Sequence, residues 1–283
     1  MRAYLSGLLA PRRIAAWSAG LPNHSVPQHA VLQAIIDRWG HYQGSELDHT
    51  LSPDDDMLSA HSAEDVQHYL RTGLSALELI VEAMVLARKT GFGSILDLPC
   101  GGGRVTRHLV RFFSDSEIFV SDIERNKQAF VAAQFGVKAI DLRADFSAPA
   151  PGLCDLIFVG SLLTHLNEAM FCRAVDFFIN TLAPEGVLIA TTHGRYSATA
   201  IPAGRKHMAH DPIARTVAGP YARHGFGFRL QDRRRYGTQY GTSFTSPSWL
   251  AQLIERRTDV GLLGFKERAW DDHQDALIVQ KLP

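Results

Sequence analysis

Hydrophobic and polar positions change their spacing along this chain, and the change separates short apolar runs from longer segments with apolar residues at every third or fourth position. The first pattern is typical of buried strands and the second of amphipathic helices. The predicted strands are 94–98, 117–122, 137–140, 154–159 and 186–192; the predicted helices are 62–71 and 75–87 before them, and about 103–113, 124–135 and 167–182 between them. This alternation predicts an α/β fold, with a parallel sheet covered by helices on both faces.

The end of the chain predicts an antiparallel element. A predicted helix at 246–257 is followed by two apolar runs, 261–270 and 275–282, which are joined only by residues 271–274. A parallel connection needs a crossover of about a dozen residues or more, so this short one must be a hairpin. We therefore expect a mostly parallel sheet into which one antiparallel strand enters at the end.

Two regions do not fit the alternating pattern. Residues 1–60 mix short apolar clusters with prolines and end in the acidic run Asp54–Asp56, with helical spacing at 31–39. They predict an N-terminal cap or extension, which packs on the domain 61–283, covers a substrate or binds a partner. Residues 194–245 interrupt that domain and are rich in basic, aromatic and glycine residues. A connection this long predicts a substrate lid, which we expect to contain its own hairpin.

The charges of the chain balance, because 29 Lys and Arg face 29 Asp and Glu. A neutral molecule offers no general field for nucleic acid or for an anionic membrane, which argues against both partners. Arg233–Arg235, which lies among aromatic residues, leaves a local nucleic-acid patch open as an alternative. The three cysteines lack metal-ligand spacing, and no apolar stretch is long enough to cross a membrane. We expect a cytoplasmic protein without a metal site.

The stretch that follows the first predicted strand carries the clearest chemical signal. It reads Asp97-Leu98-Pro99-Cys100-Gly101-Gly102-Gly103 and leads from the strand into a helix. Three consecutive glycines leave bare backbone on which a flat ligand can lie. The carboxylate of Asp97 would repel a pyrophosphate, whereas it would attract the ammonium and sulfonium of S-adenosylmethionine. A tight turn without a ligand is the alternative.

This stretch resembles the D-x-G-x-G-x-G loop of class I S-adenosylmethionine-dependent methyltransferases, with Pro99 in the place of the first glycine. The resemblance runs from about Tyr69 to the C-terminus. It implies a Rossmann-like sheet of seven strands with an antiparallel last strand. The phrases Leu-Pro-Cys-Gly and Thr-Thr-His-Gly are also similar to those of an uncharacterised bacterial-type group of small-molecule methyltransferases.

The resemblance also implies a set of cofactor contacts. Asp122 ends the second predicted strand, where a carboxylate can accept hydrogen bonds from both ribose hydroxyls. Family members have an acid like Asp145 that binds the adenine amino group, and a neighbour like Phe146 that packs on the ring. A turn-capping role is the alternative for Asp145. The predicted cofactor residues are Asp97, Pro99, Cys100, Gly101, Gly103, Asp122, Ile123, Asp145, Phe146, Gly160 and Ser161.

Two histidines follow strands that end at the same sheet edge. His165 follows 154–159 and His193 follows 186–192, so either is placed to remove a proton from an acceptor hydroxyl. We rank His165 first, and the alternative for both is simple packing or capping. Arg195, Tyr236 and Tyr240 of the predicted lid are the candidate substrate contacts.

These features predict an enzyme that transfers a methyl group from S-adenosylmethionine to a small-molecule or carbohydrate-like acceptor, with oxygen favoured over nitrogen. A nucleic-acid-directed methyltransferase, an NAD-dependent oxidoreductase and a non-catalytic nucleotide-binding module are the alternatives on the same fold. Asp97 before the glycines and the terminal hairpin weigh against the oxidoreductase.

Overall fold

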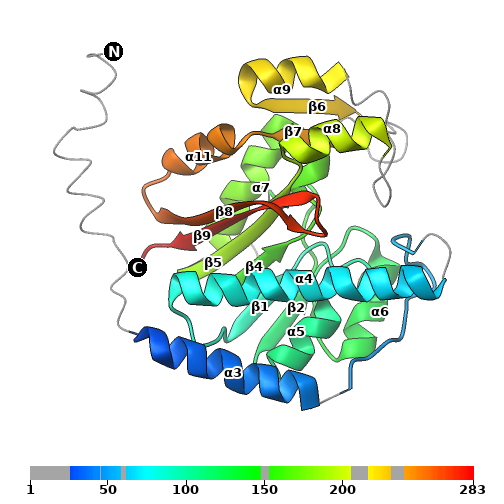
Figure 1. Ribbon diagram of the computed structural model, residues 1–283, viewed down its shortest axis with the longest axis vertical. Helices are drawn as coiled ribbons and strands as arrows, with labels where there is room; N and C mark the ends of the chain where they lie inside the picture. The colour runs from blue at the N-terminus through cyan, green and yellow to red at the C-terminus, as the bar shows by residue number, and fades with distance from the viewer. Residues whose placement is uncertain (1–25, 45, 59–61, 148–152, 205–215, 231–238) are drawn as a thin grey trace.

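The computed structural model describes residues 26–44, 46–58, 62–147, 153–204, 216–230 and 239–283, which form a layered α/β domain around one seven-stranded sheet (Figure 1). The strand order is β3-β2-β1-β4-β5-β9-β8. The strands are β1 (Ser94–Asp97), β2 (Glu117–Val120), β3 (Lys138–Ala139), β4 (Cys154–Val159), β5 (Leu182–Thr192), β8 (Val260–Trp270) and β9 (Gln274–Lys281). In this sheet β9, which lies between β5 and β8, is the strand that runs opposite to the other six. The predicted fold class is confirmed.

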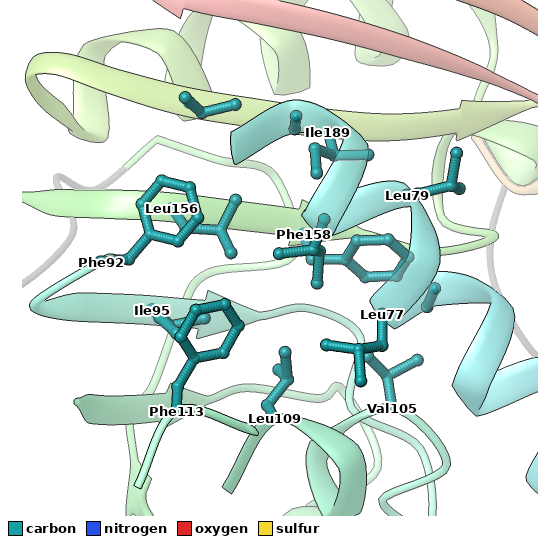
Figure 2. Packing of buried hydrophobic residues seen from close by; sticks show 14 of the residues in the cluster. Leu77, Leu79, Phe92, Ile95, Val105, Leu109, Phe113, Leu156, Phe158 and Ile189 are labelled. Carbon is teal, nitrogen blue, oxygen red and sulfur yellow. The ribbon is translucent and has the colours of Figure 1, made fainter. Parts of the chain in front are cut away.

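Neighbouring residues of each central strand point to opposite faces of the sheet and build two cores. Ile95 and Phe158 belong to the core beneath α4 (Ala63–Ala87), which Figure 2 shows, and α5 (Thr106–Phe112) and α6 (Arg125–Phe135) complete that layer. The other core, which contains Leu96 and Ile157, is covered by α7 (Glu168–Thr181) and α11 (Pro247–Glu255). Each fully buried side chain of this size contributes about 1.5–3 kcal/mol of transfer free energy.

The helix α4 corrects the prediction of two helices, 62–71 and 75–87. The chain forms one continuous helix from Ala63 to Ala87, capped by the Ser62 side chain. The Ser75 hydroxyl donates to the carbonyl of Thr72 at 2.9 Å and so does not start a second helix. Gly73 serves close packing, because a Cβ there would lie 2.1 Å from the carbonyl oxygen of Arg104. This contact presses α4 directly onto the glycine-rich turn.

The described part of the N-terminal region packs against the domain. The helix α3 (Gln28–Gly44) is longer than the predicted 31–39, and its Trp39 and Tyr42 stack at 5.1 Å beside α5. Residues 46–58 then run back to the glycine-rich turn, where the buried Arg107 donates to the carbonyls of Asp48 (2.8 Å) and Thr50 (3.2 Å).

The insertion lies over the carboxyl edge of the sheet (Figure 1). It contains α8 (Arg195–Ala203), α9 (Ala218–His224) and the antiparallel pair β6 (Phe226–Leu230) and β7 (Gly241–Thr245), which is the expected hairpin. A short 3-10 helix, η1 (Leu163–His165), follows β4, and the Ser243 hydroxyl of β7 donates to the Leu163 carbonyl at 2.8 Å. Arg233–Arg235 and Tyr236 lie outside the described residues. Within the described ranges, no helix has the length and apolar content needed to cross a membrane.

Candidate functional site

A cavity of about 730 Å³ opens at the carboxyl edge of the sheet, in the size range of small-ligand sites. It extends from the turn after β1, past the ends of β2 and β4, to the loop before α7 and the residues just before β7. Because the connections from β1 and β4 lead to opposite sides of the sheet, this edge is where open α/β folds bind ligands.

The glycine-rich turn and Asp122 form one hydrogen-bonded unit in the cavity wall. Gly101 (φ +51°) and Gly103 (φ +82°) adopt left-handed conformations that favour glycine. The carboxylate of Asp122 accepts the backbone N–H of Gly101 and that of Glu124, both at 2.9 Å. Each oxygen keeps a second lone pair, so Asp122 can also accept from ligand hydroxyls. Burial raises the pKa of Asp122.

Asp97 lies beneath the turn rather than above it. Its side chain is almost fully buried and accepts the Thr106 hydroxyl at 2.6 Å. Burial raises the pKa of Asp97 to about 7. We expected this carboxylate to hold the charged end of the cofactor; it lines the cavity from beneath the turn, where it is bonded to Thr106.

Every predicted cofactor residue except Gly103 lines the cavity. Gly103 is needed for packing, because a Cβ there would lie 2.4 Å from the Phe135 ring. Ile123 is 67% exposed and presents an apolar surface beside Asp122. Asp145 accepts the Ser147 N–H at 3.1 Å, as in the turn-capping alternative, and still faces the cavity.

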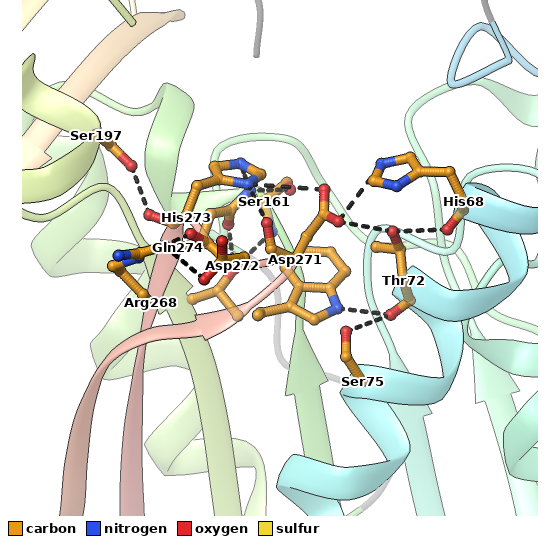
Figure 3. Close-up of polar contacts among 12 residues, drawn as sticks. His68, Thr72, Ser75, Ser161, Ser197, Arg268, Asp271, Asp272, His273 and Gln274 are labelled. Atoms are coloured by element: carbon orange, nitrogen blue, oxygen red, sulfur yellow. Dashed lines mark hydrogen bonds and ion pairs between the residues drawn. The ribbon is translucent and has the colours of Figure 1, made fainter. Parts of the chain in front are cut away.

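The far end of the cavity is built around Gly160, Ser161 and Trp270. A Cβ on Gly160 would lie 2.8 Å from the indole of Trp270, so the ring packs directly on this backbone. The Ser161 hydroxyl accepts from the Gln274 side-chain amide at 2.8 Å. Figure 3 shows Ser161 and Gln274 beside the turn of the β8–β9 hairpin, where Asp271 lies between two histidine side chains. The hairpin thus brings the last strands of the chain to the ligand site.

His165 lines this far end, and the insertion positions it. Its Nδ1 lies 2.8 Å from the carbonyl oxygen of Gly241, and its ring stacks on Tyr240 with 4.6 Å between centroids. Because a carbonyl only accepts, Nδ1 must donate, which leaves the lone pair of the neutral ring on Nε2. Burial lowers the pKa of His165, and the bond to Gly241 opposes that shift.

The structure separates the other predicted residues from the cavity. His193 is buried beside Phe244 and does not line the cavity, because the backbone of Thr245 donates to its carbonyl and β7 covers it. Burial holds the pKa of His193 well below its usual value. Arg195 also lies outside the cavity lining and pairs with Glu267. Of the predicted substrate contacts that are described, Tyr240 lines the cavity.

Several residues of the cavity wall were not predicted. Among them are Asp55, Tyr69, Arg104 and Trp270. The acidic run 54–56 and the arginine directly after the glycines were visible signals in the sequence. Nothing local in the sequence indicates that Trp270 reaches the turn after β4, because that contact depends on the pairing of β9 with β5.

Solved structures of low sequence identity share this architecture. The plantazolicin methyltransferase BpumL in complex with S-adenosylhomocysteine is 14% identical, with a TM-score of 0.52 over 90% of this chain and 98% of that one. Magnesium protoporphyrin IX methyltransferase from Synechocystis with bound S-adenosylhomocysteine is 10% identical, with a TM-score of 0.51 over 87% and 94% of the two chains. The chain has the class I methyltransferase fold.

A third structure of the class I methyltransferase fold, an S-adenosylmethionine-dependent methyltransferase from Clostridium acetobutylicum, is 13% identical, with a TM-score of 0.50 over 75% and 92% of the chains. No family model and no curated protein matches the sequence. The fold that the glycine-rich turn implied by resemblance is therefore confirmed by structural similarity.

Proposed function

We propose that this protein transfers a methyl group from S-adenosylmethionine to a hydroxyl group of a small-molecule acceptor. The observation that carries the proposal is the continuity of one cavity, which joins Asp122 and the glycine-rich turn at one end to His165 at the other. A cofactor bound along the turn and an acceptor beside His165 would share this cavity.

The walls near the turn favour S-adenosylmethionine over a dinucleotide. Asp122 offers lone pairs to the ribose hydroxyls, and the exposed Ile123 offers an apolar surface to the adenine. Because its pKa is raised to about 7, Asp97 is partly ionised at neutral pH, and this negative charge beneath the turn disfavours a pyrophosphate. The same charge attracts the sulfonium and the ammonium of S-adenosylmethionine.

The chemistry assigned to His165 follows from its hydrogen bond. The acceptor oxygen attacks the methyl carbon, the carbon–sulfur bond breaks, and the sulfonium becomes the neutral thioether of S-adenosylhomocysteine. The hydroxyl proton passes to Nε2 of His165, which is free to accept it because Nδ1 donates to Gly241. The lowered pKa keeps the ring neutral, and so able to act as a base, at neutral pH.

The acceptor end is rich in apolar and aromatic side chains. Tyr240, Met170 and Trp270 contribute to its walls, and Gln239 and Tyr240 bring the insertion into contact with the cavity. In this proposal the insertion 194–245 acts as a lid that excludes water and aligns acceptor, methyl carbon and sulfur. Aromatic walls suit a small flat molecule or the apolar face of a carbohydrate.

The test is calorimetry with S-adenosylhomocysteine, S-adenosylmethionine and NAD in parallel. We expect the first two to bind and NAD to show no binding. Tight NAD binding would overturn the proposal in favour of the oxidoreductase alternative, and the absence of any binding would remove the nucleotide site altogether.

A further inference from the structure

Asp55 carries an unpaired oxygen in the cofactor cavity. One oxygen, Oδ1, accepts the Met57 N–H at 3.0 Å, while Oδ2 has no hydrogen-bond partner among the described residues. The residue is only 5% exposed, and a Cβ on Gly102 would lie 2.1 Å from Oδ2. A buried carboxylate oxygen without a partner is costly, so its position over the glycine-rich turn needs an explanation.

Tyr69 presents a second unpaired group close to the first. Its hydroxyl is buried and lacks a hydrogen-bond partner in the part of the chain that the structure describes. Burial, the nearby charge of Asp55 and a weak interaction between the two side chains raise the pKa of Tyr69, so the hydroxyl stays protonated and lies close to Asp55. A neighbouring hydroxyl and carboxylate without a further hydrogen-bond donor match an ammonium group, which donates to oxygen and neutralises the charge.

Arg104 supplies the opposite charge at the same place. Its guanidinium lies over the rings of Tyr69 (5.8 Å) and Trp270 (5.1 Å) and has no hydrogen-bond or ion-pair partner within the described ranges. By contrast, Arg125 and Lys127, which also line the cavity, pair with carboxylates. A guanidinium held by ring stacking, with its donors unused, is suited to bind a carboxylate through two parallel hydrogen bonds.

The segment that carries Asp55 is fastened on both sides of the turn. Asp54 accepts from the Asn126 side chain at 2.7 Å, and Asp56 pairs with Lys127 at 2.7 Å. Arg107 holds the upstream part through the backbone of 48–50. The segment is therefore built into the cavity wall and does not merely lie on the surface.

We propose that Asp55, Tyr69 and Arg104 bind the methionine end of S-adenosylmethionine, with its α-ammonium on Asp55 and Tyr69 and its α-carboxylate on Arg104. This inference rests on the proposed function and moves the ammonium contact from Asp97 to Asp55. It makes residues 46–58 a part of the cofactor site.

The experiment compares S-adenosylhomocysteine with 5′-methylthioadenosine, which has the same nucleoside but no amino-acid group. Calorimetry on Asp55→Asn and Arg104→Met should show S-adenosylhomocysteine affinity lowered roughly tenfold or more, with 5′-methylthioadenosine affinity unchanged. Asp122→Ala should weaken both ligands, because both carry the ribose. Arg111→Met is the matched control for Arg104, because Arg111 also stacks on a ring but lies outside the cavity lining, and it should change neither affinity.

Binding of 5′-methylthioadenosine also shows that each variant has folded its nucleoside site. If both variants keep full affinity for S-adenosylhomocysteine, or if they weaken the two ligands equally, the assignment of the methionine end is overturned. If the wild-type protein binds neither ligand, the proposed function fails as well, and that result is distinct from the previous two.

Discussion

One backbone carbonyl decides which ring nitrogen of His165 carries the proton. Nδ1 of His165 donates to the Gly241 carbonyl, and burial disfavours the charged ring. Nε2 is therefore the unprotonated nitrogen. The carbonyl comes from the insertion, far along the chain. The insertion and the proposed base are therefore connected through one hydrogen bond.

His165→Gln should lower kcat by roughly a hundredfold while S-adenosylhomocysteine affinity stays the same, because glutamine can keep the bond to Gly241 but cannot accept the proton. The neutral ring is the active form and its pKa lies below the usual value. The wild-type rate should therefore be flat at neutral pH and fall only as the pH drops through that lowered value, and the variant should lose this acid limb. Both are measured as S-adenosylhomocysteine release with a panel of small hydroxyl compounds.

The comparison for this prediction is His193→Gln, which should reduce stability but keep the acid limb, because His193 lies outside the cavity lining. If His193→Gln removes the acid limb and His165→Gln retains it, the base has been assigned to the wrong histidine. If both variants keep normal rates, catalysis depends on alignment and the acceptor is an amine.

The sequence predicted individual site residues where their position follows from the order of the strands along the chain. The turn after β1 and Asp122 could be located because a carboxylate at the end of the second strand must lie beside the first loop of a parallel sheet. His165 and His193 could not be separated, since both follow strands at the same edge. Only the placement of β7 over His193 distinguishes them, and that depends on packing far along the chain.

The contact between α4 and the glycine-rich turn links two elements through bare backbone. Gly73→Ala should place a Cβ against the Arg104 carbonyl, push the helix away from the turn and cost about 1–3 kcal/mol of stability. Affinity for S-adenosylhomocysteine should fall with it, because Arg104 follows the turn. Denaturant unfolding and calorimetry on the same variant measure the two effects.

Gly40→Ala is the matched control, because Gly40 lies in the helix α3 with no atom near the position of a Cβ. There the substitution should stabilise the protein by about 0.5–1 kcal/mol through the helix preference of alanine. A Gly73→Ala variant as stable as the Gly40→Ala variant would show that α4 can shift at no cost.

Element order and strand identity were predictable, whereas helix boundaries were less so. Buried strands such as β4 appear as apolar runs in any context, and the short link in the last hairpin allows one geometry. The division of α4 into two helices was wrong because Ser75 resembles a start signal locally. The packing of Gly73 on Arg104 decides instead, and it involves two distant parts of the chain.

Across the whole molecule, buried titratable groups act on stability in opposite directions. Burial lowers the pKa of His108 to about 4, so between pH 6.5 and 4 the unfolded chain binds a proton that the folded chain does not. His108 therefore makes the folded protein less stable as the pH falls. Asp97, whose pKa is raised to about 7, binds its proton at a higher pH in the folded chain than in the unfolded chain. Asp97 therefore makes the folded protein more stable as the pH falls over the same range.

Replacing His108 by Gln removes the pH-dependent contribution of His108 to stability and leaves the contributions of the other groups as they are in the wild type. The wild type should lose more stability than His108→Gln between pH 7.5 and pH 5, by about 2 kcal/mol. Urea unfolding at the two pH values measures this difference. The exposed His29→Gln should follow the wild type, and equal losses in His108→Gln and the wild type would mean that His108 titrates normally in the fold.

The cavity takes Asp55 from the early part of the chain and Trp270 from the last hairpin. During synthesis, the glycine-rich turn and Asp122 leave the ribosome long before the indole that completes the far wall. The turn and Asp122 are therefore synthesised early, but the core that supports the turn also includes Trp270 and Ile278 from the last two strands. Ligand binding stabilises only chains that have a competent site, so any stabilisation that depends on the indole wall reaches the chain only near the end of translation.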